Sequence, residues 1–325
     1  MEAPASKRSR FVAQSSGRAV RITPYVLSVL ELLQRFRYLP STYIHALIGG
    51  GETYYKDVLT RLFHERYIGR PASSWAAVNA RYRPAVYELL EKGEQALKEH
   101  GRWRRRLKTG NSFPHELMVC LIQASFELGS REHGLQLIKA QDILDHPKCP
   151  LHTRHAKHPW GIPVSFNYNN GCETRYVEQY VETDGEFFGL AHVHAAGRTT
   201  IIFPGFEADR RTEPLEPDAY ERSSIKKKFL AFREIAGGGL YQSRFGLPNA
   251  IVPFITINET HMRNMMRLVE RITDGRGTKL FLFKYLSSFT TFEQFPVPDG
   301  HMVYAPWLRV GHPPYDILRE LGCNK

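Results

Sequence analysis

The segments TDGEFFGL (residues 183–190) and TTIIFPGFEAD (residues 199–209) decide the fold of the larger part of this chain. Both are rich in residues that favour strands, and Ala196 and Gly197 lie between them. This pattern predicts two antiparallel strands joined by a tight turn at Ala196 and Gly197.

The predicted hairpin gathers four carboxylates at its open end. With that loop, Asp184 faces Asp209 and Glu186 faces Glu207, all on one side of the ribbon. Directly opposed residues have Cβ atoms about 4.5–5.5 Å apart, so these acids repel one another. A divalent cation, a basic partner or raised pKa values would offset the repulsion, and Mg²⁺ or Mn²⁺ suits an oxygen-only site. The alternative is a solvated hairpin end whose acids pair with neighbouring arginines or a lysine.

A helix rich in lysine is predicted after the hairpin, in SSIKKKFLAF (residues 223–232). Its buried stripe consists of Ile225, Phe229 and Phe232. At 100° per residue, Lys228 lies about 60° from that stripe and can lean toward the sheet. Lys226 is the second choice, whereas Lys227 is predicted to point away.

The rest of this domain alternates between strands and helices. A helix over residues 114–129 opens it after a boundary at residues 110–111, and strands over 250–257 and 279–285 flank an amphipathic helix over 261–272. Strand, helix and strand after a hairpin predict a mixed sheet flanked by helices, so the fold class is α/β (α+β) for residues 111–325.

The charge of the chain is concentrated in its first third. The 325 residues carry a net charge of +11, and residues 1–110 hold 20 Lys and Arg against 9 Asp and Glu, whereas the remainder holds 24 of each. Such asymmetry indicates a domain that binds a polyanion, joined to a neutral one. The alternative is a solvated basic surface without a partner.

The order of elements in the first third is typical of a winged helix-turn-helix. Residues 1–22 are small, polar and basic, and we predict a disordered arm. Thr23 then caps a helix, a short helix over 41–48 and a third over 52–66 follow, and two strands over 67–70 and 83–89 precede a helix over 91–100. Residues 23–110 are therefore predicted to form a winged-helix domain.

In such a domain the third helix enters the major groove and the wing contacts the DNA backbone or the minor groove. A basic connector after the domain either contacts phosphates or is a solvated linker. The predicted DNA-binding residues are Lys56, Thr60, Arg61, His64, Arg70, Arg81, Arg83, Arg104 and Arg105. A helical protein-interaction module of the same shape is the alternative.

The cysteines, the histidines and the apolar residues indicate the redox compartment and bear on zinc binding and membrane insertion. The four cysteines form no CxxC pair, which indicates a reducing compartment. His146, Cys149, His152, His155 and His158 recur every three residues but match no standard zinc spacing, so zinc and a loop with exposed histidines both stay open. No run approaches the roughly 20 apolar residues of a membrane span, and we predict a cytoplasmic protein.

These motifs carry a resemblance to a known family. The pieces concerned are RL…YIGR (residues 61–70), VYEL (86–89), HEL (115–117), Asp184 with FFGL (187–190), FEADRRTEP (206–214) and the lysine helix. On them the chain resembles the replication-relaxation family of plasmid and mobile-element proteins. The most specific piece is EADRRTEP (residues 207–214).

The resemblance implies a winged helix followed by a domain like the restriction endonucleases, the PD-(D/E)XK fold, and a role in plasmid replication or DNA relaxation. In active nucleases of that fold an Asp and a Glu hold the metal, which would be Asp184 and Glu207, and a lysine two residues after the Glu aligns the water. Here Thr183 replaces the Pro, and Asp209 replaces that lysine. Lys228 or Lys226 can have taken its place, which gives Asp184, Glu207, Asp209 and Lys228 as the catalytic set.

Three functional hypotheses follow. The first is a DNA-binding replication or mobilisation factor whose nuclease-like domain has no robust catalysis, associated with the nucleoid or a plasmid and bound to double-stranded DNA. The second is an endonuclease that depends on Mg²⁺ or Mn²⁺. The third is a winged-helix transcriptional regulator whose C-terminal domain dimerises or senses a partner. If the site is inactive no cofactor is implied, no membrane partner is expected, and a homodimer stays open.

Overall fold

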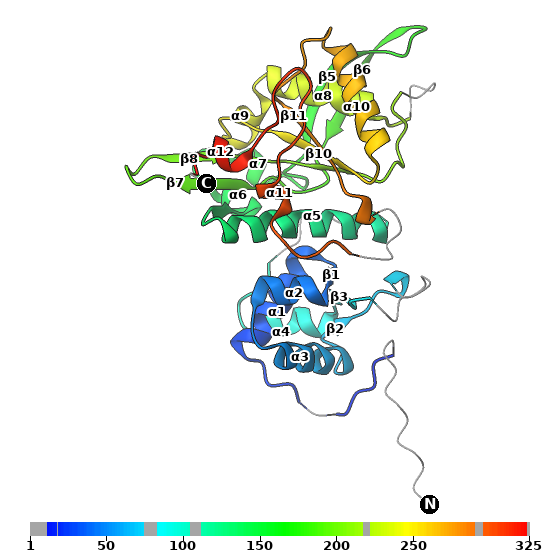
Figure 1. Ribbon diagram of the computed structural model, residues 1–325. Helices are drawn as coiled ribbons and strands as arrows, with labels where there is room; N and C mark the ends of the chain where they lie inside the picture. Colours follow the sequence, from blue (N-terminus) through cyan, green and yellow to red (C-terminus); the bar gives the residue numbers. More distant parts are fainter. Residues whose placement is uncertain are drawn as a thin grey trace, which may run out of the picture. The chain divides into compact units, whose positions relative to one another are not determined.

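The computed structural model describes residues 12–17, 19–74, 83–104, 112–216, 222–289 and 295–323, and the chain divides into two compact units (Figure 1). The first unit comprises Met1–Ala124 with Thr291–Pro298, and the second comprises Ser125–Thr290 with Asp299–Lys325. The division falls at Ala124, inside a long helix, rather than at the predicted boundary of residues 110–111. Strands and helices occur in both units, which confirms a mixed α/β chain.

The first unit consists of helices around a small antiparallel sheet. Its elements, in chain order, are α1 (Pro24–Phe36), β1 (Leu39–Pro40), α2 (Ser41–Ile48), α3 (Glu52–His64), β2 (Ile68–Gly69), a 3₁₀ turn (Ala72–Ser74), β3 (Val86–Leu89) and α4 (Glu91–Glu99). The sheet order is β1-β3-β2. The cores of the predicted helices and of the second strand are confirmed.

Local sequence explains where these helices begin and end. The Thr23 hydroxyl accepts a hydrogen bond from the Val26 amide at 3.3 Å, with Pro24 in the first turn of α1. Between α2 and α3, Gly49 and Gly50 have φ of +79° and +98°, which residues with a Cβ rarely adopt. The interruption between the helices predicted over 41–48 and 52–66 is therefore present, and it separates α2 from α3.

Residues 12–17, part of the predicted disordered arm, are held by hydrogen bonds to the end of α3. The Gln14 amide donates to His64 Nδ1 at 3.1 Å. The Ser15 hydroxyl and both the amide and hydroxyl of Ser16 donate to the Glu65 carboxylate at 2.6–2.8 Å. These hydrogen bonds lower the pKa of Glu65 to about 2. A single carboxylate with three donors thus anchors this segment.

The second unit is larger and combines antiparallel and parallel strands. The division between units lies within α5 (Phe113–Glu132). The following elements are β4 (Gln136–Ile138), α6 (Ala140–Asp145), α7 (Leu151–Arg154), β5 (Ile162–Asn169), β6 (Thr174–Val181), β7 (Gly189–Val193), β8 (Thr199–Ile202), β9 (Glu207–Asp209), α8 (Ile225–Gly237), α9 (Leu240–Phe245), β10 (Val252–Thr256), α10 (Glu259–Ile272), β11 (Phe281–Tyr285), a 3₁₀ turn (Ser287–Phe289), α11 (His301–Tyr304) and α12 (Ile317–Glu320).

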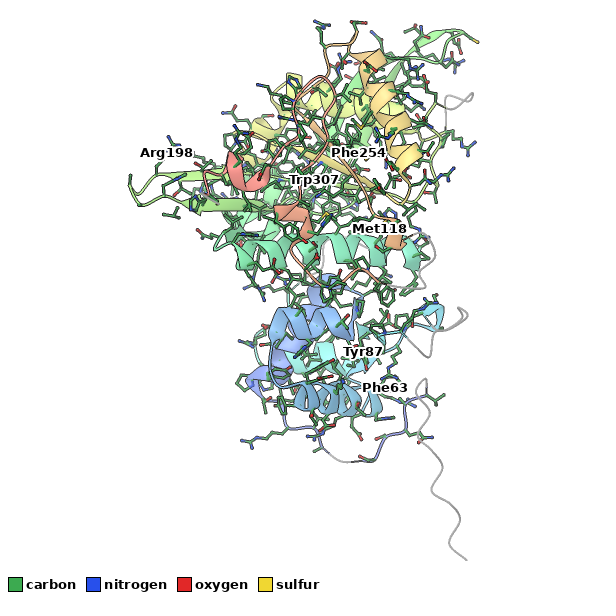
Figure 2. All side chains as sticks on the ribbon, in the orientation of Figure 1. Phe63, Tyr87, Met118, Arg198, Phe254 and Trp307 are labelled. Atoms are coloured by element: carbon green, nitrogen blue, oxygen red, sulfur yellow. The ribbon has the colours of Figure 1, made fainter. Side chains whose placement is uncertain are left out.

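Three sheets are formed within the described part of this unit. One is antiparallel with the order β4-β7-β8, one is parallel with the order β11-β10-β9, and β5 and β6 form a separate hairpin. The core between α8 and the parallel sheet is aromatic: Phe229 lies 4.7 Å from Phe254 and 4.8 Å from Phe281, ring centroid to ring centroid. Phe254, labelled in Figure 2, is fully buried. The predicted strands flanking a helix are thus present as β10, α10 and β11.

The predicted hairpin is shorter than expected and its register is different. Leu190 pairs with Ile202 and Val193 with Thr199, so the strands are shifted by one residue from the predicted pairing. The strand β9 leaves the hairpin and pairs in parallel with β10. Asp184 therefore does not face Asp209, nor Glu186 Glu207, as strand partners. All three residues of β9 are buried, as is typical of a parallel strand that is covered on both faces.

None of the described helices is long and apolar enough to cross a membrane.

Candidate functional site

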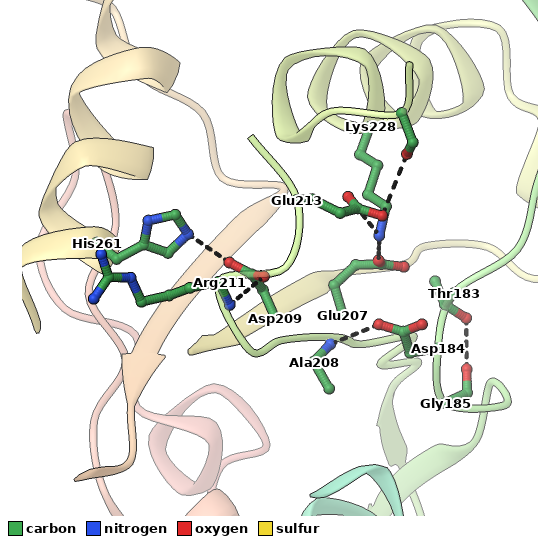
Figure 3. A network of polar contacts seen from close by, with 11 residues as sticks. Thr183, Asp184, Gly185, Glu207, Ala208, Asp209, Arg211, Glu213, Lys228 and His261 are labelled. Carbon is green, nitrogen blue, oxygen red and sulfur yellow. Dashed lines mark hydrogen bonds and ion pairs between the residues drawn. The ribbon is translucent and has the colours of Figure 1, made fainter. Parts of the chain in front are cut away.

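Three of the predicted site residues, Asp184, Glu207 and Lys228, lie together, and Glu213 joins them (Figure 3). Glu207 begins β9 and is 2% exposed. Lys228, from the first turn of α8, donates to Glu207 Oε2 at 2.8 Å and lies 3.2 Å from Glu213 Oε2. Glu213 belongs to the loop after β9. The structure thus brings Lys228 onto the carboxylate from a different element, as its angle on the helix predicted.

The position of Lys228 follows from the local structure of α8. The Ser224 hydroxyl caps the helix by accepting from the Lys227 amide at 3.3 Å. The predicted stripe of Ile225, Phe229 and Phe232 is buried, which turns Lys228 toward β9. Burial lowers the pKa of Lys228, but the charges of Glu207, Asp184 and Glu213 outweigh it and raise the pKa above its ordinary value. Lys228 is therefore a stable ammonium among carboxylates.

The other two lysines of this helix behave differently from each other. Lys226 reaches Glu216 at 2.9 Å and the Asn169 carbonyl at 2.8 Å. Lys227 was predicted to point away, and this is wrong: it is only 7% exposed, and its ammonium donates to the Arg222 carbonyl at 3.0 Å. The ammonium also lies 5.1 Å from the centroid of the Tyr168 ring. At that distance the cation is attracted electrostatically to the face of the aromatic ring.

Asp184 is held next to β9 by the backbone. Its Oδ2 accepts from the Ala208 amide at 2.9 Å, and the Thr183 hydroxyl donates to the Gly185 carbonyl at 2.6 Å. Asp184 is half-buried, and its charge reaches Lys228. Glu186 is also half-buried. The acids at positions 184 and 207 are therefore neighbours, although they are not the strand partners predicted from the hairpin.

Two glycines allow the Asp184 segment to approach β9. The Gly185 amide donates to the Phe206 carbonyl at 3.2 Å, and a Cβ on Gly185 would lie 2.1 Å from the Phe206 ring. Reciprocally, a Cβ on Gly205 would lie 2.4 Å from the Phe187 ring. Each glycine thus lies under the aromatic ring of the opposite segment, which fixes Asp184 beside Glu207.

Asp209 has a separate set of partners. Its Oδ2 lies 2.5 Å from His261 Nε2, and its Oδ1 accepts from the Arg211 amide at 2.8 Å. His261 lies in the first turn of α10, where the Asn258 side chain caps the helix. Sequence reasoning did not single out His261. The only signal was its place at the start of an amphipathic helix, which says nothing about a partner in β9.

Two carboxylates of the site could hold a divalent cation. Asp184 and Glu207 supply oxygen ligands, and Mg²⁺ is usually bound through one or two carboxylates with its remaining positions filled by water and phosphate. This donor set fits the ion. No group of three or more His, Cys, Asp and Glu side chains arranged for a metal is found among the residues the structure describes.

The histidine series over residues 146–158 lies around α6 and α7. Cys149 is 1% exposed, and burial raises the pKa of its thiol. His146 Nδ1 accepts from the Lys148 amide at 3.2 Å, which closes a local turn. These contacts describe a loop, and the zinc hypothesis gains no support from them.

The predicted DNA-binding residues of the first unit fall into three groups. Lys56, Thr60 and Arg61 are exposed on α3, and Lys56 pairs there with Glu52 at 2.5 Å. Arg104 is exposed, and its backbone binds the Gln34 side chain. Arg81 and Arg105 lie outside the described residues.

The remaining predicted contacts point inward. His64 and Arg83 are each 8% exposed, so neither side chain is presented to DNA in this conformation. Arg70 donates to the Tyr87 hydroxyl at 2.7 Å, and its guanidinium lies 4.2 Å from the centroid of Phe63. Figure 2 labels both rings. The side chains of these three residues make contacts within the unit and thereby stabilise it.

Neither family models, nor curated proteins, nor solved structures give a match to this chain.

Proposed function

We propose that the chain is a DNA-binding protein whose second unit hydrolyses phosphodiester bonds with the help of Mg²⁺ or Mn²⁺. The observation that carries the proposal is the contact of 2.8 Å between Lys228 and Glu207, with Asp184 fixed beside them on the Ala208 amide. Two acids and one lysine in mutual reach are the residue types that metal-dependent nucleases use. An ion pair with a purely structural role would need only Lys228 and Glu207, without Asp184 held beside them by the Ala208 amide.

The order of elements supports the same proposal. A helix (α5) precedes the antiparallel strands β4, β7 and β8, with α6, α7 and the β5–β6 hairpin inserted between β4 and β7. The chain then continues through β9, α8 and α9 into the parallel strand β10. The resemblance to the replication-relaxation family implies a restriction-endonuclease-like domain, and this order is compatible with it. In the first unit, α1 to α4 with the sheet β1-β3-β2 are likewise compatible with a winged helix.

The side chains would share the work as follows. Asp184 and Glu207 would hold the cation, which supplies Lewis-acid stabilisation of phosphate charge and a more acidic water. Lys228, which Glu207 and Glu213 share, lies where an ammonium can orient the attacking water or offset negative charge on the phosphate. Asp209 is held by His261 and takes no direct part. The role in replication of plasmids or mobile elements is proposed from the resemblance alone.

The proposal is tested on supercoiled plasmid. We expect the full chain to nick or linearise it with Mg²⁺ or Mn²⁺ but not with EDTA, and we expect Glu207→Gln to lose this cutting while it still shifts DNA in a gel. Glu216→Gln, which removes a carboxylate of the exposed Lys226 pair, is the matched control and should cut normally. A gel shift by the wild type without cutting under any metal condition would refute the nuclease and leave a DNA-binding factor.

Binding of DNA through α3 has a test of its own. Arg61→Ala is expected to weaken binding at low salt and to reduce the slope of log K against log[salt] by about one, because one phosphate contact releases about one counterion. Fluorescence anisotropy at several salt concentrations measures that slope. Arg263→Ala, an exposed arginine of the second unit that pairs with Glu259, should leave it unchanged. An equal slope for Arg61→Ala and the wild type would remove Arg61 from the interface.

A further inference from the structure

Asp209 is held as firmly as the acids around Glu207, although it takes no direct part in the proposed hydrolysis. It is 7% exposed. His261 Nε2 lies 2.5 Å from Asp209 Oδ2, and the Arg211 amide donates to Asp209 Oδ1 at 2.8 Å. Because an ionised carboxylate only accepts hydrogen bonds, His261 Nε2 carries the proton of the first bond. The buried carboxylate therefore connects α10 to the loop that follows β9.

The backbone of Arg211, which Asp209 holds, has an uncommon conformation. Its φ is +63°, in the left-handed region that residues with a Cβ rarely adopt. The bond from its amide to the carboxylate two residues earlier closes the turn. The Arg211 side chain is exposed, and its guanidinium makes no ion pair or hydrogen bond with any residue that the structure describes. The turn thus presents an uncompensated positive charge to solvent.

This turn lies at the end of the parallel sheet where β9 and β10 finish. Thr256, the last residue of β10, pairs with Asp209, and α10 follows β10 in the chain. In open α/β sheets ligands bind outside the carboxyl ends of the parallel strands, and the first turn of a helix favours negative charge. In Figure 3 the side chains of Arg211 and His261 extend away from Lys228. The position and the charge of the turn both suit an anion.

The turn is also close to the acidic site along the strand. Glu207 and Asp209 lie two residues apart in β9, so their side chains share one face of the sheet. The separation along the strand is about 6–7 Å, and neighbouring phosphates of one DNA strand are a similar distance apart. A strand with one phosphate at Glu207 therefore brings the next phosphate toward Arg211. A planar guanidinium can bind two phosphate oxygens at once.

We propose that Arg211 binds the DNA phosphate next to the one held at Glu207, and that Asp209 and His261 are positioning residues that hold the Arg211 turn. The inference rests on the proposed nuclease function and names where the second unit contacts its substrate. It also gives a role to the acid that stands in place of the expected lysine. Lys228 supplies the ammonium from α8, and Asp209 fixes a second cation beside the site.

The first test measures DNA binding without metal, by fluorescence anisotropy of a short duplex with the full chain in EDTA. Arg211→Ala is expected to weaken binding about tenfold at low salt and to reduce the slope of log K against log[salt] by about one. Arg211→Lys should keep the slope, because the charge remains, but bind more weakly. Arg267→Ala is the control: this arginine is exposed on α10, bonds Asn264, and should keep the wild-type slope. An unchanged slope for Arg211→Ala overturns the proposal.

The second test examines the positioning role of His261. His261→Ala removes the donor to Asp209 and should weaken DNA binding by about three- to tenfold, whereas His261→Gln keeps a donor near the Nε2 position and should restore most of the affinity. In the Arg211→Ala background His261→Ala should cause no further loss. A residue that only stabilises the fold would lower the affinity equally in both backgrounds, so additive losses refute the positioning role.

Cutting of plasmid separates this inference from the proposed nuclease. Arg211→Ala should raise the KM for DNA about tenfold and change kcat less than about twofold, whereas Glu207→Gln should lose kcat. Normal cutting by Arg211→Ala with an unchanged KM leaves the nuclease in place and refutes the phosphate contact. If the wild type does not cut but Arg211→Ala still reduces the salt slope, the nuclease fails and the contact of Arg211 with DNA stands.

Discussion

Lys228→Met is expected to lower the free energy of unfolding by about 3–5 kcal/mol, because it removes the ammonium that faces a carboxylate with 2% exposure. Breaking a buried ion pair from one side leaves the other charge in a poorly solvated place. Glu207→Gln should cost less, since Lys228 keeps Glu213 and its side chain is 25% exposed. Urea unfolding followed by circular dichroism measures both changes.

The matched control for this experiment lies on the same helix. Lys226→Met breaks a pair with Glu216, whose side chain is 36% exposed, and should cost less than about 1 kcal/mol. Equal losses for Lys226→Met and Lys228→Met would show that Glu207 is better solvated than its position indicates.

The contribution of Lys228 to stability depends on pH in a definite direction. The folded-state pKa of Lys228 is raised from 10.5, so its stabilisation is complete below pH 10.5 and is lost only as the pH rises through the folded pKa.

The direction of Lys228 toward the sheet could be predicted from the sequence because helical geometry is local, whereas its contact with Glu207 could not, because that contact depends on where β9 lies. The spacing of Ile225, Phe229 and Phe232 fixes the buried stripe, and the angle of Lys228 from that stripe follows from the helix period. The same reasoning failed for Lys227. Its ammonium donates a hydrogen bond to the Arg222 carbonyl and contacts the face of the Tyr168 ring. Both partners lie outside the helix, so the helix period does not predict where they are.

The partner of β9 could not be predicted, because a short buried strand pairs equally well on either side. The predicted hairpin continues through Pro204 and Gly205, but Pro204 instead bridges to Ile251 in the parallel direction. Once β9 pairs with β10, Asp209 points to α10 and meets His261. The acids predicted to face each other do not, and His261 was not predicted as a partner of Asp209. Both errors follow from the long-range pairing of β9 with β10.

In the first unit the error was one of burial rather than of element order. The helices and strands occur where capping residues and periodicity predicted them. His64, Arg70 and Arg83 were assigned to DNA because of their charge and place in the chain. Long cationic side chains also pack against aromatic rings, as Arg70 does on Phe63. Sequence alone does not distinguish these two uses of an arginine.

Gly185→Ala is expected to destabilise the second unit by about 1–3 kcal/mol and to reduce any metal-dependent cutting of DNA by about 100-fold. The added methyl carbon would lie 2.1 Å from the Phe206 ring, so either the ring or the backbone of Asp184 must move. Movement of that backbone breaks the bond between the Ala208 amide and Asp184, which holds the acid beside Glu207. Urea unfolding and plasmid nicking on the same preparation separate the loss of stability from the loss of activity.

Gly237→Ala provides the comparison, since a methyl group there meets nothing within 4 Å at the end of α8. It should keep both stability and cutting, which shows that an added methyl group alone is harmless. If Gly185→Ala proved as stable as Gly237→Ala, the close approach of the Asp184 segment to Phe206 would be incorrect. If it lost stability but kept cutting, Asp184 would have no part in holding the cation, and the site would reduce to Glu207 with Lys228 and Glu213.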